Sequence, residues 1–174
     1  MVAPPCPQVR AQFWALFEEA GVARTRVDLL PLAASTSEHL SQYGLLDIAL
    51  DPWPYAGTTT TAEALYMGVP VLTLAGACHA HNVGVSLLSA VGLAGQGWVA
   101  RSADEYVARA VALAADVPAL AALRAGLRER MLASPLCDGP GFVARLEGVY
   151  HDLFRRWAEG HAGGSGCAAT GTER

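Results

Sequence analysis

The feature that most constrains this fold is an alternation of short apolar runs with stretches of helical periodicity. Four apolar runs predict buried strands, at residues 26–32, 45–51, 69–74 and 98–101. Apolar side chains at helical spacing predict helices at residues 8–20, 35–43, 62–67, 83–91, 103–115, 118–133 and 142–158. Strands that alternate with helices form parallel sheets covered on both faces, so the sequence predicts an α/β fold.

The predicted sheet is small. Three or four strands fall short of the about five or six of a complete doubly wound sheet, and the chain opens with a helix. We therefore expect one truncated domain over residues 1–158 that lacks its first strand or two. Residues 159–174 are rich in glycine and predict a flexible tail.

Composition excludes several classes of protein. Apolar residues make up 52% and charged residues 16%, which favours a packed core over disorder. A net charge of −4, with arginine as the sole basic residue type, gives no electrostatic argument for nucleic acid. The four cysteines lack CxxC spacing, so we expect neither disulfides nor a zinc site. Without a membrane-length apolar run or a secretory signal, an intracellular, soluble protein is expected.

The most informative segment is the turn that follows the predicted strand 45–51. Gly57 lets the backbone approach a ligand closely, and Thr58, Thr59 and Thr60 place hydroxyls beside the first N–H groups of a helix. Ligands bind at the carboxyl ends of strands in α/β sheets, and helix N-termini attract phosphate. The pattern predicts a phosphate site. The alternative is a purely structural turn that caps the helix.

Glu63 lies one helical turn beyond Thr59 and Thr60. A carboxylate would repel an adjacent phosphate, so Glu63 is predicted to accept hydrogen bonds from a ribose diol. In the structural alternative, Glu63 is the capping-box partner of Thr60.

Further polar residues follow the next predicted strand, at the same edge of the sheet. His79, His81 and Asn82 are expected in a loop, where they contact a sugar or diphosphate or else have a capping role. We expect no metal, because only Cys78 adds a ligand nearby. Tyr55 either lines a sugar pocket or supports the turn.

Several segments resemble the C-terminal catalytic lobe of the SPINDLY and O-GlcNAc transferase family. The strongest is residues 50–70, LDPWPYAGTTTTAEALYMGVP, accompanied by GACHAHNVGVSLL at 76–88 and SPLCDGP at 134–140. The resemblance runs from about residue 5 to residue 157 and is greatest to plant SPINDLY proteins.

The resemblance implies a GT-B fold, in which two Rossmann-like lobes form a cleft and tetratricopeptide repeats precede them. This chain would be the C-terminal, nucleotide-sugar-binding lobe. Gly57 to Thr60 would hold the diphosphate and Glu63 the ribose, while His39 matches a family histidine near the base and ribose. The implied partners are a nucleotide sugar, acceptor proteins, the missing lobe and the repeats, in the nucleus and cytoplasm. No cofactor besides the donor sugar is expected.

Departures from the O-GlcNAc transferase pattern bear on the donor. Thr36 replaces a lysine, Thr58 a histidine and Glu63 an aspartate. These features are of the SPINDLY type, and that resemblance implies protein O-fucosylation from GDP-fucose, with UDP-GlcNAc as the next candidate. The chain has no lysine, so amides, hydroxyls, arginine, histidine or the missing lobe must balance the diphosphate charge.

The sequence thus predicts a lobe that transfers a sugar to Ser or Thr, with its acid or base in the missing lobe. Two alternatives stay open. One is a catalytically incomplete module that binds nucleotides or partners, and the other is a nucleotide-sugar epimerase of the same two-lobed architecture.

Overall fold

The computed structural model describes residues 6–162. The first part of the chain forms α1 (Pro7–Glu19), the 3-10 helix η1 (Arg24–Arg26), α2 (Thr36–Gln42) and the 3-10 helix η2 (Tyr43–Leu45). The central part forms β1 (Ala49–Leu50), α3 (Thr59–Tyr66), β2 (Val71–Leu74), α4 (His79–Ala90) and β3 (Val99–Ala100). Three helices follow, α5 (Ala103–Ala115), α6 (Val117–Leu132) and α7 (Gly139–Ala162).

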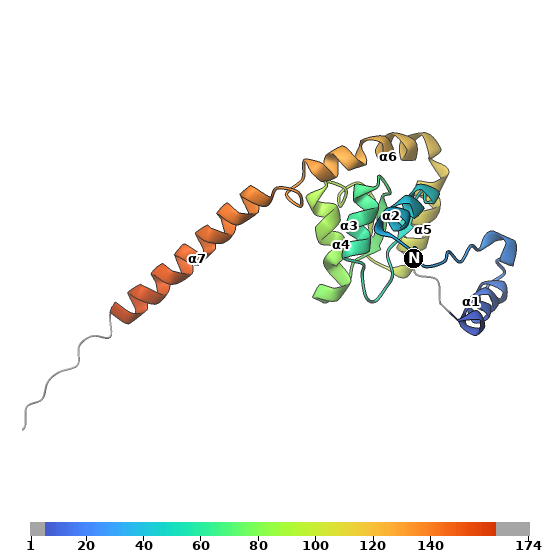
Figure 1. Cartoon of the computed structure of the whole chain (residues 1–174), viewed down its shortest axis with the longest axis horizontal. Helices are drawn as coiled ribbons and strands as arrows, with labels where there is room; N and C mark the ends of the chain where they lie inside the picture. The colour runs from blue at the N-terminus through green and yellow to red at the C-terminus, as the bar shows by residue number, and fades with distance from the viewer. Residues whose placement is uncertain (1–5, 163–174) are drawn as a thin grey trace, which may run out of the picture.

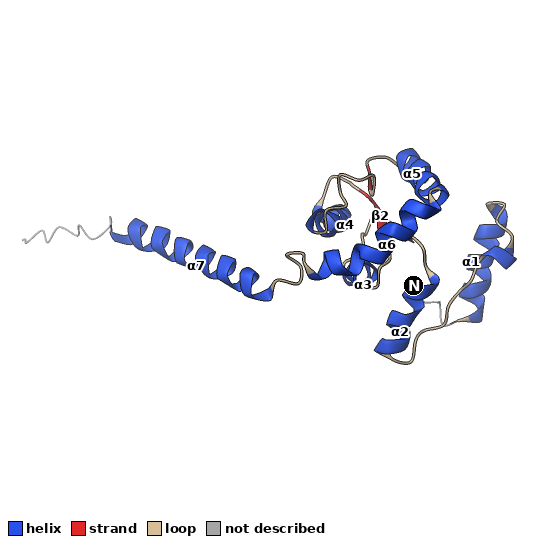
Figure 2. Cartoon of the chain, turned by 90° about the horizontal axis from the view of Figure 1, so that it is seen from above, coloured by secondary structure: helices blue, strands red, loops and turns tan. Residues whose placement is uncertain are grey.

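The strands form a parallel sheet in the order β1-β2-β3. Ala49 is paired with Val71, and Thr73 with Val99. Helices α3, α4, α5 and α6 surround these strands (Figure 2). Leu65, Leu72, Leu88, Leu93 and Leu127 are fully buried and bring α3, β2, α4 and α6 into one core. The predicted parallel α/β arrangement is confirmed.

The predicted strand at residues 26–32 is wrong. The segment contains the end of η1 and then irregular backbone. Its carbonyl groups face α1, since Arg10 Nη2 donates to the Leu29 oxygen at 3.0 Å and Trp14 Nε1 donates to the Val27 oxygen at 3.4 Å. With Pro31 unable to donate a ladder hydrogen bond, the apolar run packs without joining the sheet.

The other predicted elements differ mainly at their ends. Strand β1 covers only Ala49–Leu50 of the predicted run 45–51, because η2 ends at Leu45 and the backbone bends at residues 47–48. Helix α7 continues to Ala162, past residue 159 where a flexible tail was expected to begin. The rest of that tail, residues 163–174, lies outside the described residues.

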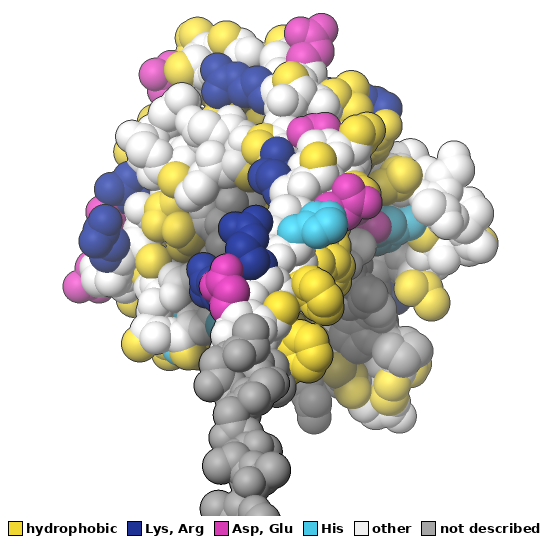
Figure 3. Space-filling view, turned by 90° about the vertical axis from the view of Figure 1, so that its left-hand side faces the viewer, with side chains coloured by type: hydrophobic (Ala, Val, Ile, Leu, Met, Phe, Trp, Pro, Cys, Tyr) yellow, Lys and Arg dark blue, Asp and Glu magenta, His cyan; other side chains and the backbone are white. Residues whose placement is uncertain are grey.

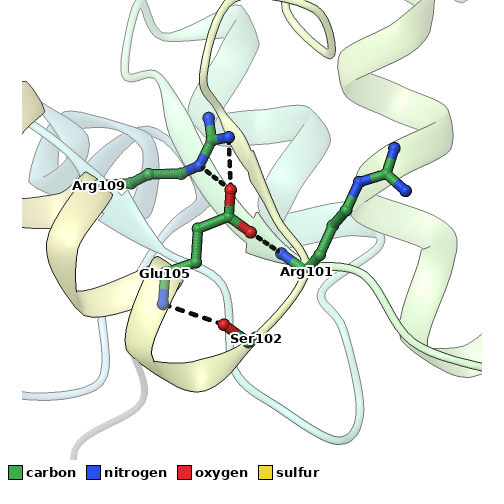
Figure 4. A network of polar contacts seen from close by, with 4 residues as sticks. All are labelled: Arg101, Ser102, Glu105 and Arg109. Carbon is green, nitrogen blue, oxygen red and sulfur yellow. Dashed lines mark hydrogen bonds and ion pairs between the residues drawn. The ribbon is translucent and has the colours of Figure 1, made fainter.

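Helices α2 and α5 begin with matching caps. In α2, Ser35 Oγ accepts the Glu38 N–H at 3.2 Å. In α5, Ser102 Oγ accepts the Glu105 N–H at 3.2 Å, and Glu105 Oε2 accepts the Arg101 N–H at 2.6 Å (Figure 4). The Arg101 N–H and then Arg109 lower the pKa of Glu105. Ser-x-x-Glu spacing therefore fixes both helix starts locally.

The first and last helices expose apolar faces. Helix α7 projects from the body, and α1 lies apart from the strands (Figures 1 and 2). Hydrophobic side chains gather on one side of the projecting end and basic side chains on another (Figure 3). The exposed apolar residues of these two helices are Val9, Phe13, Leu16, Phe17, Phe142, Val143, Val149, Tyr150, Leu153, Phe154 and Trp157. Such faces are typical of surfaces that pack against further protein.

Membrane-length helices were also sought in the part of the chain that the structure describes. No single helix in residues 6–162 is both long and apolar enough to cross a membrane. Helices α5 and α6 meet those criteria only when taken together, and they are bent by 91° at their junction.

The close packing of α4 on the sheet yields a prediction. A Cβ at Gly84 would lie 2.5 Å from both Asp51 Oδ2 and Thr73 Oγ1. Gly84→Ala is therefore expected to lower the free energy of unfolding by about 1–3 kcal/mol, measured by urea denaturation. The matched control is Gly126→Ala in α6, where a Cβ meets nothing within 4 Å. It should raise stability by about 0.5–1 kcal/mol. Equal effects of the two variants would contradict the packing described.

Candidate functional site

The candidate site lies where the strands end and the next helices begin. Helices α3, α4 and α5 follow β1, β2 and β3 in turn, so the three helix starts share the carboxyl edge of the sheet. The Ala56 N–H donates to the Ala80 oxygen at 3.1 Å, which joins the loop before α3 to the first turn of α4. This edge is where α/β sheets bind ligands.

Asp51 holds this edge together. The side chain, 6% exposed, follows β1 directly. Its Oδ1 accepts the Gly57 N–H at 2.7 Å, and its Oδ2 accepts the Thr73 hydroxyl at 2.6 Å. The Tyr106 hydroxyl donates to the Asp51 backbone oxygen at 3.0 Å. Because both carboxylate oxygens are occupied by protein donors, Asp51 fixes the turn and is not presented to a ligand.

The threonine turn lies at the surface. Thr58, Thr59 and Thr60 are exposed, and α3 begins at Thr59. Within residues 6–162 the Thr58 side chain makes no capping hydrogen bond, so the first N–H groups of α3 have no intrahelical or side-chain cap. The Gly57 N–H, by contrast, points to Asp51. Gly57 serves close packing, since a Cβ there would lie 2.7 Å from Thr60 Oγ1.

His39 and Glu63, each predicted to contact the nucleotide, lie side by side. His39 Nε2 is 2.9 Å from Glu63 Oε2, although the residues are 24 positions apart. The Tyr43 hydroxyl donates to the same oxygen at 3.0 Å and lies 3.3 Å from the Thr60 carbonyl oxygen. The rings of His39 and Tyr43 pack edge to face, with centroids 5.6 Å apart.

This geometry decides against the capping-box alternative for Glu63. As a capping-box residue, Glu63 would reach back to the Thr60 N–H, whereas its carboxylate faces His39 and Tyr43. Sequence analysis overlooked Tyr43. A signal was present, because Tyr43 follows His39 by four residues and therefore shares its helical face.

The segment with His79, His81 and Asn82 is helical, so the predicted loop is wrong there. Helix α4 begins at His79, and Asn82 stabilises its start. Asn82 Nδ2 donates to the Gly76 oxygen at 2.7 Å and to the Cys78 oxygen at 2.8 Å, while Oδ1 accepts the Gly76 N–H at 3.1 Å. The Asn82 amide thus binds the preceding loop.

His81 packs inside this edge. Its ring lies 5.6 Å from that of Trp53, and its Nδ1 is buried without a hydrogen-bond partner among the described residues. His79 is exposed, and Tyr55 is 76% exposed. The structure therefore gathers His39, Glu63 and the threonine turn.

The buried Tyr43 and the partly buried Tyr106 both have a raised pKa. Burial, followed by the hydrogen bond and charge of Glu63, raises the pKa of Tyr43 to about 12. Burial, followed by the charge of Asp51, raises the pKa of Tyr106 to about 12. Both hydroxyls therefore stay protonated at neutral pH and act as hydrogen-bond donors.

Comparisons with known proteins establish the family. The sequence profile of glycosyl transferase family 41 matches residues 7–146. The chain belongs to glycosyl transferase family 41. A protein of Solanum lycopersicum named "Probable UDP-N-acetylglucosamine--peptide N-acetylglucosaminyltransferase SPINDLY" is 52% identical over 155 residues, which cover 89% of this chain. An Arabidopsis thaliana protein with the same designation but the name SEC is 40% identical over 124 residues, or 71% of this chain.

A solved structure gives the same result for the fold. A mutant of the O-GlcNAc transferase of Thermobaculum terrenum superposes with a TM-score of 0.78 at 38% sequence identity, covering 87% of this chain and 28% of that one. The likeness confirms the predicted Rossmann-like α/β lobe of a GT-B glycosyltransferase. The chain spans 16% of the Solanum lycopersicum relative and 12% of the SEC protein.

The raised tyrosine pKa values predict how stability depends on pH. In the folded protein the phenolate form of each tyrosine is disfavoured. The contribution of the two protonated tyrosines to the free energy of unfolding is therefore complete below pH 10 and is lost as the pH rises toward 12. The free energy of unfolding should fall across this interval in urea titrations at several pH values. Tyr43→Phe and Tyr106→Phe should each make that fall shallower. If the free energy of unfolding falls equally steeply with pH in both variants, the two tyrosines are not the cause of that fall.

Proposed function

We propose that this chain is the nucleotide-sugar-binding lobe of a protein O-glycosyltransferase. The observation that carries the proposal is the pairing of His39 and Glu63 beside the exposed start of α3. The helix N-terminus and the threonine hydroxyls would bind the diphosphate, and Glu63 would accept a ribose hydroxyl. His39 would lie at the base and ribose.

The donor we propose is GDP-fucose. Identity is 52% to the SPINDLY protein and 40% to the SEC protein, which agrees with the SPINDLY-type residues Thr36, Thr58 and Glu63. The names of both relatives give UDP-N-acetylglucosamine, so that donor is the competing candidate.

The contribution of this lobe to transfer would be electrostatic. As the bond between sugar and diphosphate breaks, negative charge grows on the leaving diphosphate. Preorganised N–H groups at the start of α3 and the hydroxyls of Thr59 and Thr60 would stabilise that charge without reorganising. The acid or base that acts on the Ser or Thr acceptor would come from a second lobe.

Further protein would complete the cleft. The exposed apolar faces of α1 and α7 support packing against additional domains, as does the small share of its relatives that the chain spans. We propose a second lobe and tetratricopeptide repeats as those domains, with nuclear and cytoplasmic acceptor proteins as substrates. By itself the chain would then bind nucleotide without completing transfer.

Nucleotide titration tests both the site and the donor. By isothermal titration calorimetry at matched ionic strength, GDP is expected to bind about 10-fold or more tightly than UDP. Tighter binding of UDP would favour UDP-N-acetylglucosamine as donor. If neither nucleotide binds, the nucleotide-binding lobe is contradicted. A glycosyl-transfer assay on the same protein separates an active enzyme from a binding module.

Substitutions at the proposed contacts test the placement of the nucleotide. Thr59→Ala and Glu63→Gln should each weaken nucleotide binding by about 5-fold to 30-fold, because each removes one polar contact. Thr59→Ala should leave the urea midpoint nearly unchanged, since Thr59 is exposed. The control is Ser89→Ala in α4, which removes an exposed hydroxyl whose hydrogen bond is to the Val85 oxygen. Affinity equal to that of Ser89→Ala would overturn the assignment.

A further inference from the structure

We infer that Tyr43 is a positioning residue that orients Glu63 for ribose recognition. The inference rests on the proposed function, because it takes Glu63 as the ribose contact. Tyr43 itself would touch no ligand. Its role is to hold one oxygen of the carboxylate so that the other faces the nucleotide.

Two donors converge on a single oxygen of Glu63. An ionised carboxylate only accepts hydrogen bonds, so His39 must present a protonated Nε2 to Oε2 and Tyr43 must present its hydroxyl proton. Within the described residues 6–162, Oε1 of Glu63 has no hydrogen-bond partner. The carboxylate is thus divided into a protein-facing oxygen and an available one.

Tyr43 suits this role because it is buried and held from several sides. The residue is 8% exposed and belongs to the hydrophobic core. Its hydroxyl also lies 3.3 Å from the Thr60 carbonyl oxygen, so it joins the carboxylate to the threonine turn. One hydroxyl carries one proton, and the shorter contact of 3.0 Å is with Glu63. The fixed phenol therefore sets the rotation of the carboxylate.

The consequence is selectivity for a ribose diol. A carboxylate held at Oε2 keeps Oε1 in one direction, which reduces the entropy lost when a sugar hydroxyl binds. Loss of the Tyr43 hydroxyl would remove one of the two donors that hold Oε2, so Glu63 would rotate more easily and recognition of the ribose would weaken. Contacts to the diphosphate and base would be unaffected.

The experiment compares GDP with 2′,3′-dideoxy-GDP, which lacks both ribose hydroxyls. In the unaltered chain the dideoxy compound is expected to bind about 10-fold or more weakly. In Tyr43→Phe that ratio should fall to about 2-fold to 3-fold, while affinity for the dideoxy compound stays nearly constant. A purely structural defect would weaken both compounds equally and leave the ratio unchanged.

Tyr106→Phe is the matched control, because it also removes a partly buried hydroxyl, one that donates to the Asp51 backbone oxygen. In this control the ratio of the affinities for GDP and the dideoxy compound should equal that of the unaltered chain. Glu63→Asp is a second test that leaves Tyr43 intact: the shorter side chain draws the carboxylate away from Tyr43, so the ratio should fall likewise. An unchanged ratio in either Tyr43→Phe or Glu63→Asp would overturn the inference. Failure of the unaltered chain to bind either GDP or UDP would instead contradict the proposed function.

Discussion

The buried carboxylate of Asp51 is the interaction on which the rest of the site depends. It accepts the Gly57 N–H and the Thr73 hydroxyl, and so joins the turn after β1 to the middle strand. Burying a carboxylate costs free energy unless its oxygens are hydrogen-bonded, so both donors must be held in place. Gly84 in α4 leaves room for this hydrogen-bonded pair, because a larger residue there would displace the Asp51 carboxylate or Thr73.

Because Asp51 is fully used by protein donors, the residues that build the turn differ from those that are exposed on it. Since Asp51 takes the Gly57 N–H, the threonines that follow are left exposed at the start of α3. The residues that we propose contact the nucleotide therefore stand on a scaffold that does not. Tyr43 and Glu63 repeat the pattern at the next helical turn, where a buried donor restrains a partly exposed acceptor.

Much of the fold could be predicted from the sequence because the signals are local. The α/β class followed from the periodicity of the apolar residues, and the Ser-x-x-Glu spacing at Ser35 and Ser102 is a further local signal. Errors arose where a local pattern fits two structures. An apolar run such as residues 26–32 suits a strand or irregular packing, and only the presence of a neighbouring strand decides between them.

The family, the parallel α/β arrangement and the position of the threonine turn could all be predicted without coordinates, because each is carried by residues close together along the chain. Tertiary structure alone decided which groups the turn and Glu63 contact. Glu63 meets His39 and Tyr43, 24 and 20 positions away, and the Gly57 amide is used by Asp51. Hydrogen-bond partners of this kind depend on how α2, β1 and α3 pack, and packing is a property of the whole core, which no local pattern encodes.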